Sequence, residues 1–456
     1  MTYLDTVKLL SEKLDTQSPV LRRLDAYWAG SQPAAYLAKK SKDALQGSIR
    51  QLAVNFPRLA VESLVERLNV TGFRLGDAEE ADAALWREWT RNGLEDMAPE
   101  VHTDALVYGR SYVLVWADAS GRPSVSVESP LQVSMDFDPA TRQPRAAIKR
   151  WRDGNVSHAV LYLPEKVLHY VHKSWAGDGF PSTGWELSES LNNPFGVLPV
   201  VPFINRSRLS ELEGVSEMDD LLDLTDALNK VTADALVTSE FYARPRRWAT
   251  GLELEEDEDG NAINPFTNEE GRMWTSEDPA TKFGQFDAQG VTGYTELMAT
   301  FTQMIGALSS LPPHYLGLNG DQPPSADSIR SAEASLVSRA GALQRTFGRS
   351  WALVAALMHA VMTQADPLSV QVGTLWASAE TRTPAQQTDA AHKLVDMGVP
   401  LTVALSKGLD WSPEEVRGVR KALRADALDR MAVDLEEMLK ASAPEEVPAA
   451  EEVPSA

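Results

Sequence analysis

The sequence predicts an α+β protein in which helical segments flank a stretch of antiparallel strands. Apolar residues recur every three or four positions in the first 108 residues and again after residue 213, which is the period of an amphipathic helix. Between about residues 110 and 205, short apolar runs alternate with polar residues and are separated by turn residues, as in antiparallel sheets. With 456 residues, 43% hydrophobic and 24% charged, the chain has the size of about two to four domains and can bury a core.

The amino-terminal part is predicted to be mainly helical. Residues 1 to about 70 carry apolar residues at spacings of three and four around a basic stretch near Lys40. A second helix is expected over 81–91. A third covers 100–108 and is expected to end at Gly109, because glycine adopts the left-handed conformation that closes many helices.

The region from about 110 to 205 is predicted to be antiparallel sheet. Its apolar runs are short, and turns such as Asp138-Pro139 and Asp153-Gly154 separate them. The expected strands lie at 112–116, 124–127, 133–137, 146–151, 159–163, 167–171 and 197–203.

A long amphipathic helix is predicted from Gly214 to about Phe241, with Ser216 as its N-cap. Its apolar side chains form one stripe, and its acidic residues lie largely away from that stripe. The stripe indicates packing against a neighbour, which the sequence leaves open as part of the same chain or of another. It consists of Met218, Leu221, Leu222, Leu228, Val231, Ala235 and Leu236.

A polar, loop-rich segment follows, up to about residue 290. Arg244, Arg246 and Arg247 at its start suit acidic neighbours in the protein better than phosphate. An acidic run comes next and lacks the closing Glu of an EF-hand, so a solvated loop or a repulsive surface explains it better than a calcium site. The run is Glu253, Glu255, Glu256, Asp257, Glu258 and Asp259.

The remainder is predicted to be helical up to residue 440. A helix over about 294–310 is ended by Pro312-Pro313. A long helix covers about 325–364, and shorter helices cover 383–440. The tail beyond 441 is acidic and rich in Pro and Ala, a composition that predicts disorder.

Several kinds of chemistry are absent from the sequence. Without cysteine there is no disulfide, Cys nucleophile, iron–sulfur cluster or thiolate zinc site. No Gly-Lys-Ser/Thr phosphate loop and no Gly-x-Ser-x-Gly elbow occur. His169 and His172 lie in a predicted strand, where residues three apart point to opposite faces, so a shared metal is not expected. We therefore expect no catalytic residue, no cofactor and no metal site.

The charge balance is strongly acidic. Lys and Arg total 43 and Asp and Glu total 65, giving a net charge of −22. Because nucleic-acid binders usually carry a basic face, sequence-independent binding of the whole protein surface to the phosphate backbone is not expected. The amino terminus lacks a secretory signal pattern, and the longest charge-free stretch, 350–365, is shorter than the ~20 apolar residues of a membrane span. A buried helix is predicted there instead.

One segment is specific enough to indicate a family. Leu311-Pro312-Pro313-His314-Tyr315-Leu316-Gly317 precedes a polar loop, and Ser325-Ala326-Asp327-Ser328-Ile329-Arg330-Ser331-Ala332-Glu333 then opens the long helix. Three parts precede this segment along the chain. They are a first half rich in helices and strands, a helix that begins Gly214-Val215-Ser216, and a variable polar segment. From about residue 5 to 440 this order resembles the SPP1-type portal proteins of tailed phages.

The resemblance implies a portal fold and a ring of about twelve subunits at one capsid vertex. The ring would be the channel through which double-stranded DNA is packaged and later ejected. By position, the parts would be a wing at 1–213, stem helices at 214–243 and 291–310 with a clip at 244–290 between them, a channel loop at 311–325, a long wing-spanning helix and following segment at 326–382, a crown at 383–440 and a disordered tail at 441–456.

The resemblance also implies where the functional residues lie. The channel loop, with Asn319, Gly320, Asp321, Gln322 and Ser325, is expected to face the DNA, since its polar groups include no cation that would hold a phosphate. The acidic run is assigned to the clip surface. The subunit interface of the stem is expected at Met218, Leu221, Leu222, Leu228, Val231 and Leu236.

The partners that the resemblance implies are further copies of the chain, the major capsid protein and scaffold, the terminase large subunit, a head–tail connector or adaptor, and DNA passing non-specifically. No membrane partner is expected. The implied location is the portal vertex of the virion, after assembly in the bacterial cytoplasm. Two alternatives stay open: another capsid or head–tail junction protein, and an acidic soluble hydrolase with paired carboxylates. A ring of roughly 600 kDa with a pore wide enough for duplex DNA would separate the portal from both.

Overall fold

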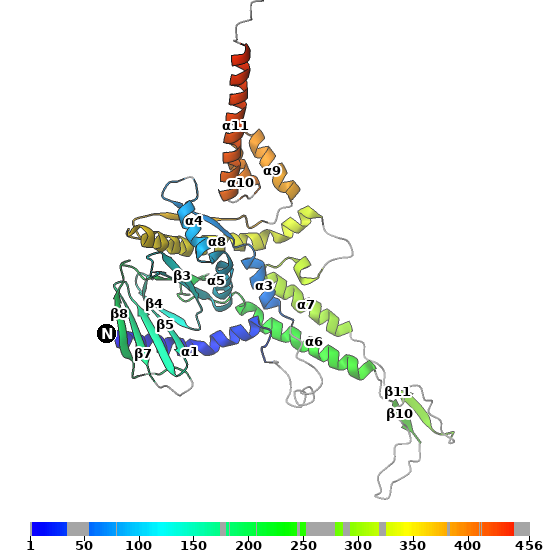
Figure 1. Ribbon diagram of the computed structural model, residues 1–456. Coiled ribbons are helices and arrows are strands. Elements are labelled where there is room, and N and C mark those ends of the chain that lie inside the picture. Colours follow the sequence, from blue (N-terminus) through cyan, green and yellow to red (C-terminus); the bar gives the residue numbers. More distant parts are fainter. Residues whose placement is uncertain are drawn as a thin grey trace, which may run out of the picture. The chain divides into compact units, whose positions relative to one another are not determined.

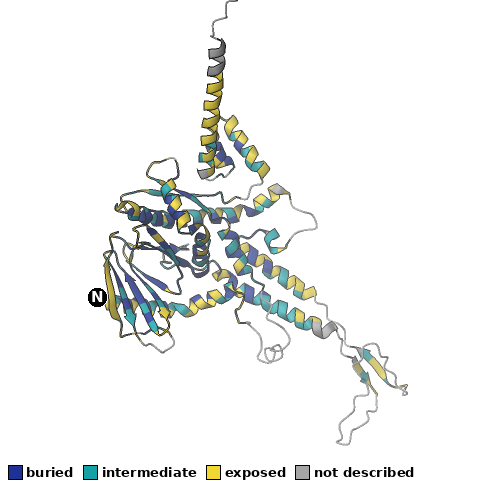
Figure 2. Cartoon of the chain, viewed as in Figure 1, coloured by how far each residue is buried: buried dark blue, intermediate teal, exposed yellow. Residues whose placement is uncertain are grey.

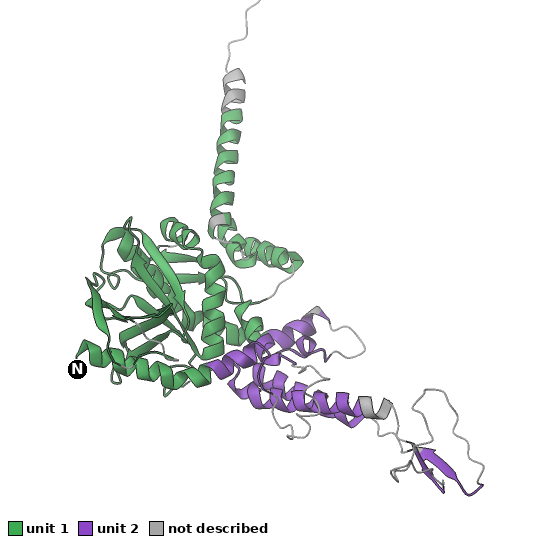
Figure 3. Cartoon of the chain, turned by 60° about the horizontal axis from the view of Figure 1, so that its bottom comes forward, with its two compact units in different colours: residues 1–21, 61–217, 334–456 green, residues 22–60, 218–333 purple. Residues whose placement is uncertain are grey.

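The computed structural model describes residues 2–33, 54–78, 80–173, 179–181, 183–206, 208–243, 247–251, 279–285, 292–318, 325–380, 384–409, 411 and 413–441. Figure 1 labels its helices and strands. The chain divides into two units, coloured separately in Figure 3. The first comprises 1–21, 61–217 and 334–456, and the second comprises 22–60 and 218–333.

Helices account for the beginning, the middle and the end of the chain, as predicted. The helices predicted over 81–91, 294–310 and 325–364 are confirmed, while the one predicted over 100–108 begins earlier and ends at Gly109 as expected. The α-helices are α1 (Tyr3–Trp28), α3 (Phe56–Val65), α4 (Ala83–Arg91), α5 (Leu94–Tyr108), α6 (Leu222–Ala243), α7 (Thr292–Ser309), α8 (Ala326–Thr363), α9 (Pro384–Asp396), α10 (Leu401–Gly408) and α11 (Pro413–Ala441). Short 3-10 helices are η1 (Asp219–Leu221) and η2 (Pro313–Leu316).

The predicted antiparallel region is confirmed, but it forms two sheets instead of one. A three-stranded sheet has the order β3-β2-β9, and a five-stranded sheet has the order β4-β5-β6-β7-β8. Strand β8 and a separate antiparallel pair, β1 with β12, had no counterpart among the predicted strands. The strands are β1 (Val70–Leu75), β2 (Arg110–Ala117), β3 (Pro123–Glu128), β4 (Val133–Phe137), β5 (Pro144–Asp153), β6 (Val156–Tyr162), β7 (Lys166–His172), β8 (Glu186–Asn192), β9 (Val200–Ile204) and β12 (Val372–Trp376).

The five-stranded sheet is buried on both faces near its middle. Successive side chains of a strand point to opposite faces, so neighbours in β5 enter different cores. Ala147 packs in a cluster with Tyr112 of β2, whereas Ile148 packs in a cluster with Val7 and Leu10 of α1. The amino-terminal helix therefore covers one face, and the three-stranded sheet contributes to the cover of the other.

A cluster of aromatic side chains surrounds α8 in the first unit. Trp351 of α8 is fully buried and donates a hydrogen bond from Nε1 to Nε2 of His102 at 2.8 Å. The His102 ring stacks on Phe347 with centroids 5.5 Å apart. Phe203 and Trp89 approach Trp351 edge to face. The predicted buried helix at 350–365 is confirmed, because its first turns form this core.

The second unit is built around α6 and α7. Their facing apolar side chains form one buried cluster with the start of α3 and the Leu-Pro-Pro segment. The segment contributes Leu311 directly, and Tyr315 and Leu316 of η2 pack against the cluster. Two short strands, β10 (Arg247–Thr250) and β11 (Lys282–Gln285), pair antiparallel between these helices in sequence.

The helix predicted to begin at Gly214 begins later, with η1 and then α6 at Leu222. Gly214 has a φ of +78° and lies against the backbone of Gly109, where a Cβ would meet the Gly109 carbonyl oxygen. The amides of Val215 and Glu217 donate to the carbonyls of Asn205 and Leu106 in other elements. Ser216 therefore lies in a connecting segment and is not the N-cap.

The carboxy-terminal helices α9, α10 and α11 follow β12 in the first unit. Helices α9 and α10 cross closely at Gly408, where an added Cβ would lie 2.5 Å from Cα of Ala391. Arg417 near the start of α11 donates to the carbonyl of Ala81 at 2.9 Å. Within the described residues, no helix is both long enough and apolar enough to cross a lipid bilayer.

Candidate subunit interface

The pairing of α6 with α7 is fixed by contacts along the length of both helices. Thr232 of α6 donates to Sδ of Met298 at 3.4 Å, and Thr238 donates to the hydroxyl of Tyr294 at 3.2 Å. Between these polar contacts and η1, Leu228 and Ile305 meet in the apolar cluster. The two helices thus form a hairpin-like pair whose inner side is already closed.

Most of the apolar stripe predicted for the subunit interface lies on this inner side. Met218, Leu221, Leu222 and Leu228 are at most 3% exposed, and Leu221 and Leu228 belong to the cluster shared with α7. Val231 is half-buried, and Leu236 is 43% exposed. The sequence left open whether the stripe packs within the chain, and in the structure its first four residues do. A contact with a second subunit through the stripe remains a prediction only for its carboxy-terminal end.

A second apolar stripe runs along the outer side of α7. Leu297, Met304 and Leu308 are 48%, 47% and 50% exposed. Met304 follows Leu297 by seven positions and Leu308 follows Met304 by four, so the three side chains lie on one side of the helix. Figure 2 shows the exposed residues along this helix in yellow. We call Leu297, Met304 and Leu308 the α7 stripe; an exposed apolar row of this kind on a helix marks a protein contact surface.

The strand pair β10–β11 presents two half-exposed aromatic side chains. Trp248 pairs with Gly284 and Ala249 pairs with Phe283, so the two rings lie on opposite faces of the ribbon. Trp248 is 37% and Phe283 is 40% exposed. A Cβ at Gly284 would lie 2.4 Å from the Trp248 ring, so glycine is required for the indole to lie across the partner strand.

Two predicted sites fall outside the described residues. The acidic run from Glu253 to Asp259 is one, and the loop residues Asn319, Gly320, Asp321 and Gln322 are the other. Ser325, the last of the loop residues, is described and exposed. Its Oγ accepts from the amide of Ser328 at 3.2 Å, so it caps α8. The DNA-facing role of the loop stays a prediction.

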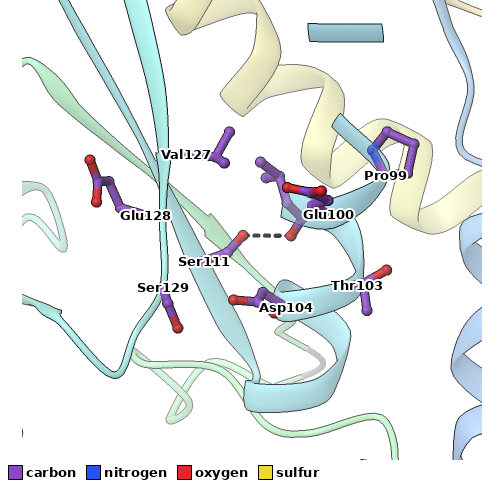
Figure 4. A pocket seen from close by; sticks show the side chains of 9 residues that line it. Pro99, Glu100, Thr103, Asp104, Ser111, Val127, Glu128 and Ser129 are labelled. Atoms are coloured by element: carbon purple, nitrogen blue, oxygen red, sulfur yellow. Dashed lines mark hydrogen bonds between the residues drawn. The ribbon is translucent and has the colours of Figure 1, made fainter. Parts of the chain in front are cut away.

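The first unit contains a hollow of about 470 Å³ between α5 and β3 (Figure 4). Glu100, Thr103 and Asp104 line it from the α5 side. The Ser111 hydroxyl is already hydrogen-bonded within the protein, because its Oγ donates to the carbonyl of Val101 at 2.6 Å. Glu128, also in the lining, accepts from Lys149 at 2.6 Å. The lining contains carboxylates and hydroxyls and includes neither histidine nor lysine.

The histidine pair that the sequence singled out has separate neighbours. His169 Nε2 lies 3.1 Å from Nδ1 of His158, whereas the His172 ring approaches Trp185. Burial, together with the nearby His158, lowers the pKa of His169. Among the residues that the structure describes, no three His, Cys, Asp or Glu side chains come together as metal ligands.

An exposed apolar stripe on a helical pair indicates a contact with another protein, and sequence similarity gives the class to which the chain belongs: phage portal proteins. The chain belongs to the SPP1 Gp6-like family of phage portal proteins, whose sequence model matches residues 8–427. It is 35% identical over 367 residues to the portal protein of Mycobacterium phage D29, covering 76% of this chain and 73% of the relative. It is 34% identical over 367 residues to the portal protein of Mycobacterium phage L5, with the same coverage.

Solved structures with a similar arrangement of helices and strands include chains of gene transfer agent particles. A chain in the virion of a native gene transfer agent particle aligns with a TM-score of 0.45 and 12% identity, covering 82% of this chain and 94% of that chain. The family assignment rests on the sequence. It gives the chain a portal function and places it in a family that is structural rather than catalytic.

Proposed function

We propose that copies of this chain form a closed ring at one vertex of the phage capsid, and that double-stranded DNA passes through the ring during packaging and ejection. The observation that carries the proposal is the α7 stripe on the outer side of the α6–α7 pair. The inner side of this pair is closed by its own core, so Leu297, Met304 and Leu308 are left for a neighbouring copy. In a cyclic ring each subunit meets its neighbours through two different surfaces, and the stripe would be one of them.

The charge of the chain suits a conduit. Every fixed contact with a phosphate adds affinity for DNA and opposes sliding. A net charge of −22 per chain, repeated around a ring, makes a wall past which DNA moves with little attachment. The ring would therefore guide DNA, while the energy for packaging would come from a separate ATPase.

The parts of the portal are assigned by position. The α6–α7 pair is the stem, the β10–β11 ribbon belongs to the clip, the loop before α8 lines the channel, and α9 to α11 form the crown. The clip, with Trp248 and Phe283 on its two faces, would meet the terminase large subunit and later the head–tail connector. The wing would meet the major capsid protein and scaffold. The ring would be assembled in the bacterial cytoplasm and remain at the portal vertex of the virion.

The assembly is tested by placing charge on the α7 stripe. Changing Leu297, Met304 and Leu308 together to Asp should leave a folded chain of 50.0 kDa that no longer forms rings, as measured by mass photometry. The matched control is Gln303→Asp, which adds charge to an exposed position on another side of the same helix and should leave rings intact. Rings of unchanged mass from the triple variant would show that the stripe is not at the interface.

A second control distinguishes the outer stripe from the inner one. Changing Leu221 and Leu228 to Asp places two charges in the closed core of the α6–α7 pair. This variant should lose helical structure, seen by circular dichroism, because an unpaired buried charge is strongly destabilising. The α7 stripe variant should keep its helical signal.

The conduit role is tested in the channel loop. Asn319→Lys with Asp321→Lys should leave rings intact but reduce DNA packaging or retention, because lysines would hold passing phosphates. The control Ser188→Lys with Glu189→Lys adds the same charge to the exposed strand β8. Equal packaging by both double variants would refute a DNA-facing loop.

A further inference from the structure

The two parts of the sequence segment that indicates the family meet in the second unit. The first part contains η2 with His314 and Tyr315, and the second part ends at Glu333, early in α8. The hydroxyl of Tyr315 donates to Oε1 of Glu333 at 3.5 Å, and Nε2 of His314 lies 3.6 Å from the same oxygen. The His314 and Tyr315 rings meet edge to face, with centroids 4.8 Å apart. Two neighbouring side chains of η2 therefore approach one carboxylate oxygen of α8.

The η2 side of this contact is held against α7. Leu316 lies directly on Gly306 of α7, where an added Cβ would be 2.4 Å from the Leu316 Cδ1. Tyr315 and Leu316 both pack against the apolar cluster of the α6–α7 pair. The amide of Leu318 donates to the carbonyl of Pro313 at 3.0 Å, which closes the turn after the 3-10 helix. The two side chains that approach Glu333 thus start from a fixed backbone.

The α8 side of the contact is a buried carboxylate. Glu333 is only 8% exposed, although glutamate is almost never buried unless it has a partner. Burying a carboxylate without hydrogen-bond donors is strongly unfavourable, so an apolar side chain would serve better at a position that only packs. Buried polar contacts add little net stability, but they require one relative placement of the elements that make them. Glu333 is therefore suited to fixing the start of α8 against η2.

The contact joins two elements that flank the predicted channel loop in the sequence. Residues 319–324 follow Leu318, which is bonded to η2, and precede Ser325, which caps α8. Holding the two ends of a segment at a fixed separation lowers the number of conformations that the segment can adopt. A tie between η2 and α8 therefore restricts the region that the intervening residues can reach.

We propose that Glu333 is a positioning residue for the channel loop. Its carboxylate accepts from Tyr315 and from His314, and this shared acceptor fixes the two ends of the loop relative to each other. Histidine can donate from Nε2 in one of its neutral tautomers and also when protonated. The inference rests on the proposed function, in which the loop faces passing DNA. Glu333 would act through the placement of the loop and would not itself touch DNA.

The absence of cysteine from the chain allows the separation of the two loop ends to be measured with spin labels. Leu318→Cys and Asp327→Cys carry the labels, and an excess of unlabelled chains ensures that only distances within one chain are recorded. Pulsed electron paramagnetic resonance should give one narrow distance with Glu333 and also with Glu333→Gln, because glutamine keeps an oxygen that accepts from Tyr315. Glu333→Leu removes the acceptor at similar side-chain size and should lose the narrow distance.

Tyr315→Phe tests the same contact from the other side, since it removes the hydroxyl and keeps the packed ring. It should also broaden the distance, and it decides alone if circular dichroism shows that Glu333→Leu does not fold. A narrow distance in both variants would overturn the proposal. Equal broadening by Glu333→Gln and Glu333→Leu would overturn it as well, because the acceptor oxygen would then not matter.

DNA packaging is measured separately on rings of the same variants. Glu333→Leu should reduce packaging or retention of DNA, whereas Glu333→Gln should leave both unchanged. The distance measurement requires neither a closed ring nor DNA, so it reports on the contact alone. Unchanged packaging by Glu333→Leu despite a broadened distance would contradict the proposed role of the loop in the channel, and the tie between η2 and α8 would still stand.

Discussion

The buried imidazole of His102 should make the stability of the first unit depend on pH. The side chain is fully buried among aromatic rings, and burial lowers its pKa from 6.5 to about 3. Trp351 donates to Nε2, so the ring proton sits on Nδ1, which has no hydrogen-bond partner among the described residues. The folded chain thus keeps His102 neutral where the unfolded chain would protonate it.

The sign and size of the effect follow from these two pKa values. Above pH 6.5 neither state is protonated, and His102 contributes no pH dependence. Between pH 6.5 and 3 the unfolded chain binds a proton that the folded chain refuses, so the free energy of unfolding falls as the pH falls. At pH 5 the loss amounts to about 2 kcal/mol, since each pH unit of this window is worth about 1.4 kcal/mol.

The variant His102→Gln isolates this contribution. Glutamine does not titrate and offers an oxygen that accepts from Trp351, so the substitution should cost stability by a similar amount at every pH. Urea unfolding of both proteins, followed by tryptophan fluorescence, should show the wild type losing about 2 kcal/mol more than the variant between pH 7.5 and pH 5. An equal loss in both proteins would refute the argument that the buried imidazole resists protonation.

Two further predictions concern close packing and a buried hydrogen bond. Gly408→Ala should destabilise the α9–α10 hairpin by ~1–3 kcal/mol, because the new methyl group meets the backbone of Ala391, whereas Gly418→Ala in open space should be neutral or stabilising; thermal unfolding of both variants compares them. Tyr27→Phe removes the hydroxyl that donates to Asp226 at 2.7 Å and should cost ~1–3 kcal/mol by urea unfolding, since the buried carboxylate loses its donor; an unchanged midpoint would contradict this.

The long elements were predictable from the sequence because their pattern repeats many times. Helix α8 continues its apolar period over 38 residues; it contains no proline, and its two glycines, Gly341 and Gly348, do not end it. Strand β8 was missed for the opposite reason. Its sequence, Glu186 to Asn192, contains two apolar residues that both face outward, so no buried side creates an alternation. The β1–β12 pair joins strands about 300 residues apart, a distance over which local patterns carry no information.

The candidate interface was only partly accessible from the sequence. An apolar stripe in the sequence indicates that one face of a helix is buried, but it does not identify the element that buries it. Leu221 and Leu228 are covered by α7 and α3 of the same chain, which required the three-dimensional arrangement to establish. The start of α6 was misplaced because the left-handed glycine at 214 acts through a contact with Gly109, far away in the sequence.

The proposed ring must have a channel wide enough for duplex DNA. Negative-stain electron microscopy of the purified protein tests it most directly, through averaged end-on views combined with the particle mass. We expect closed rings of roughly 600 kDa with a central pore of that width. Monomers, open chains, or rings without such a pore would contradict it.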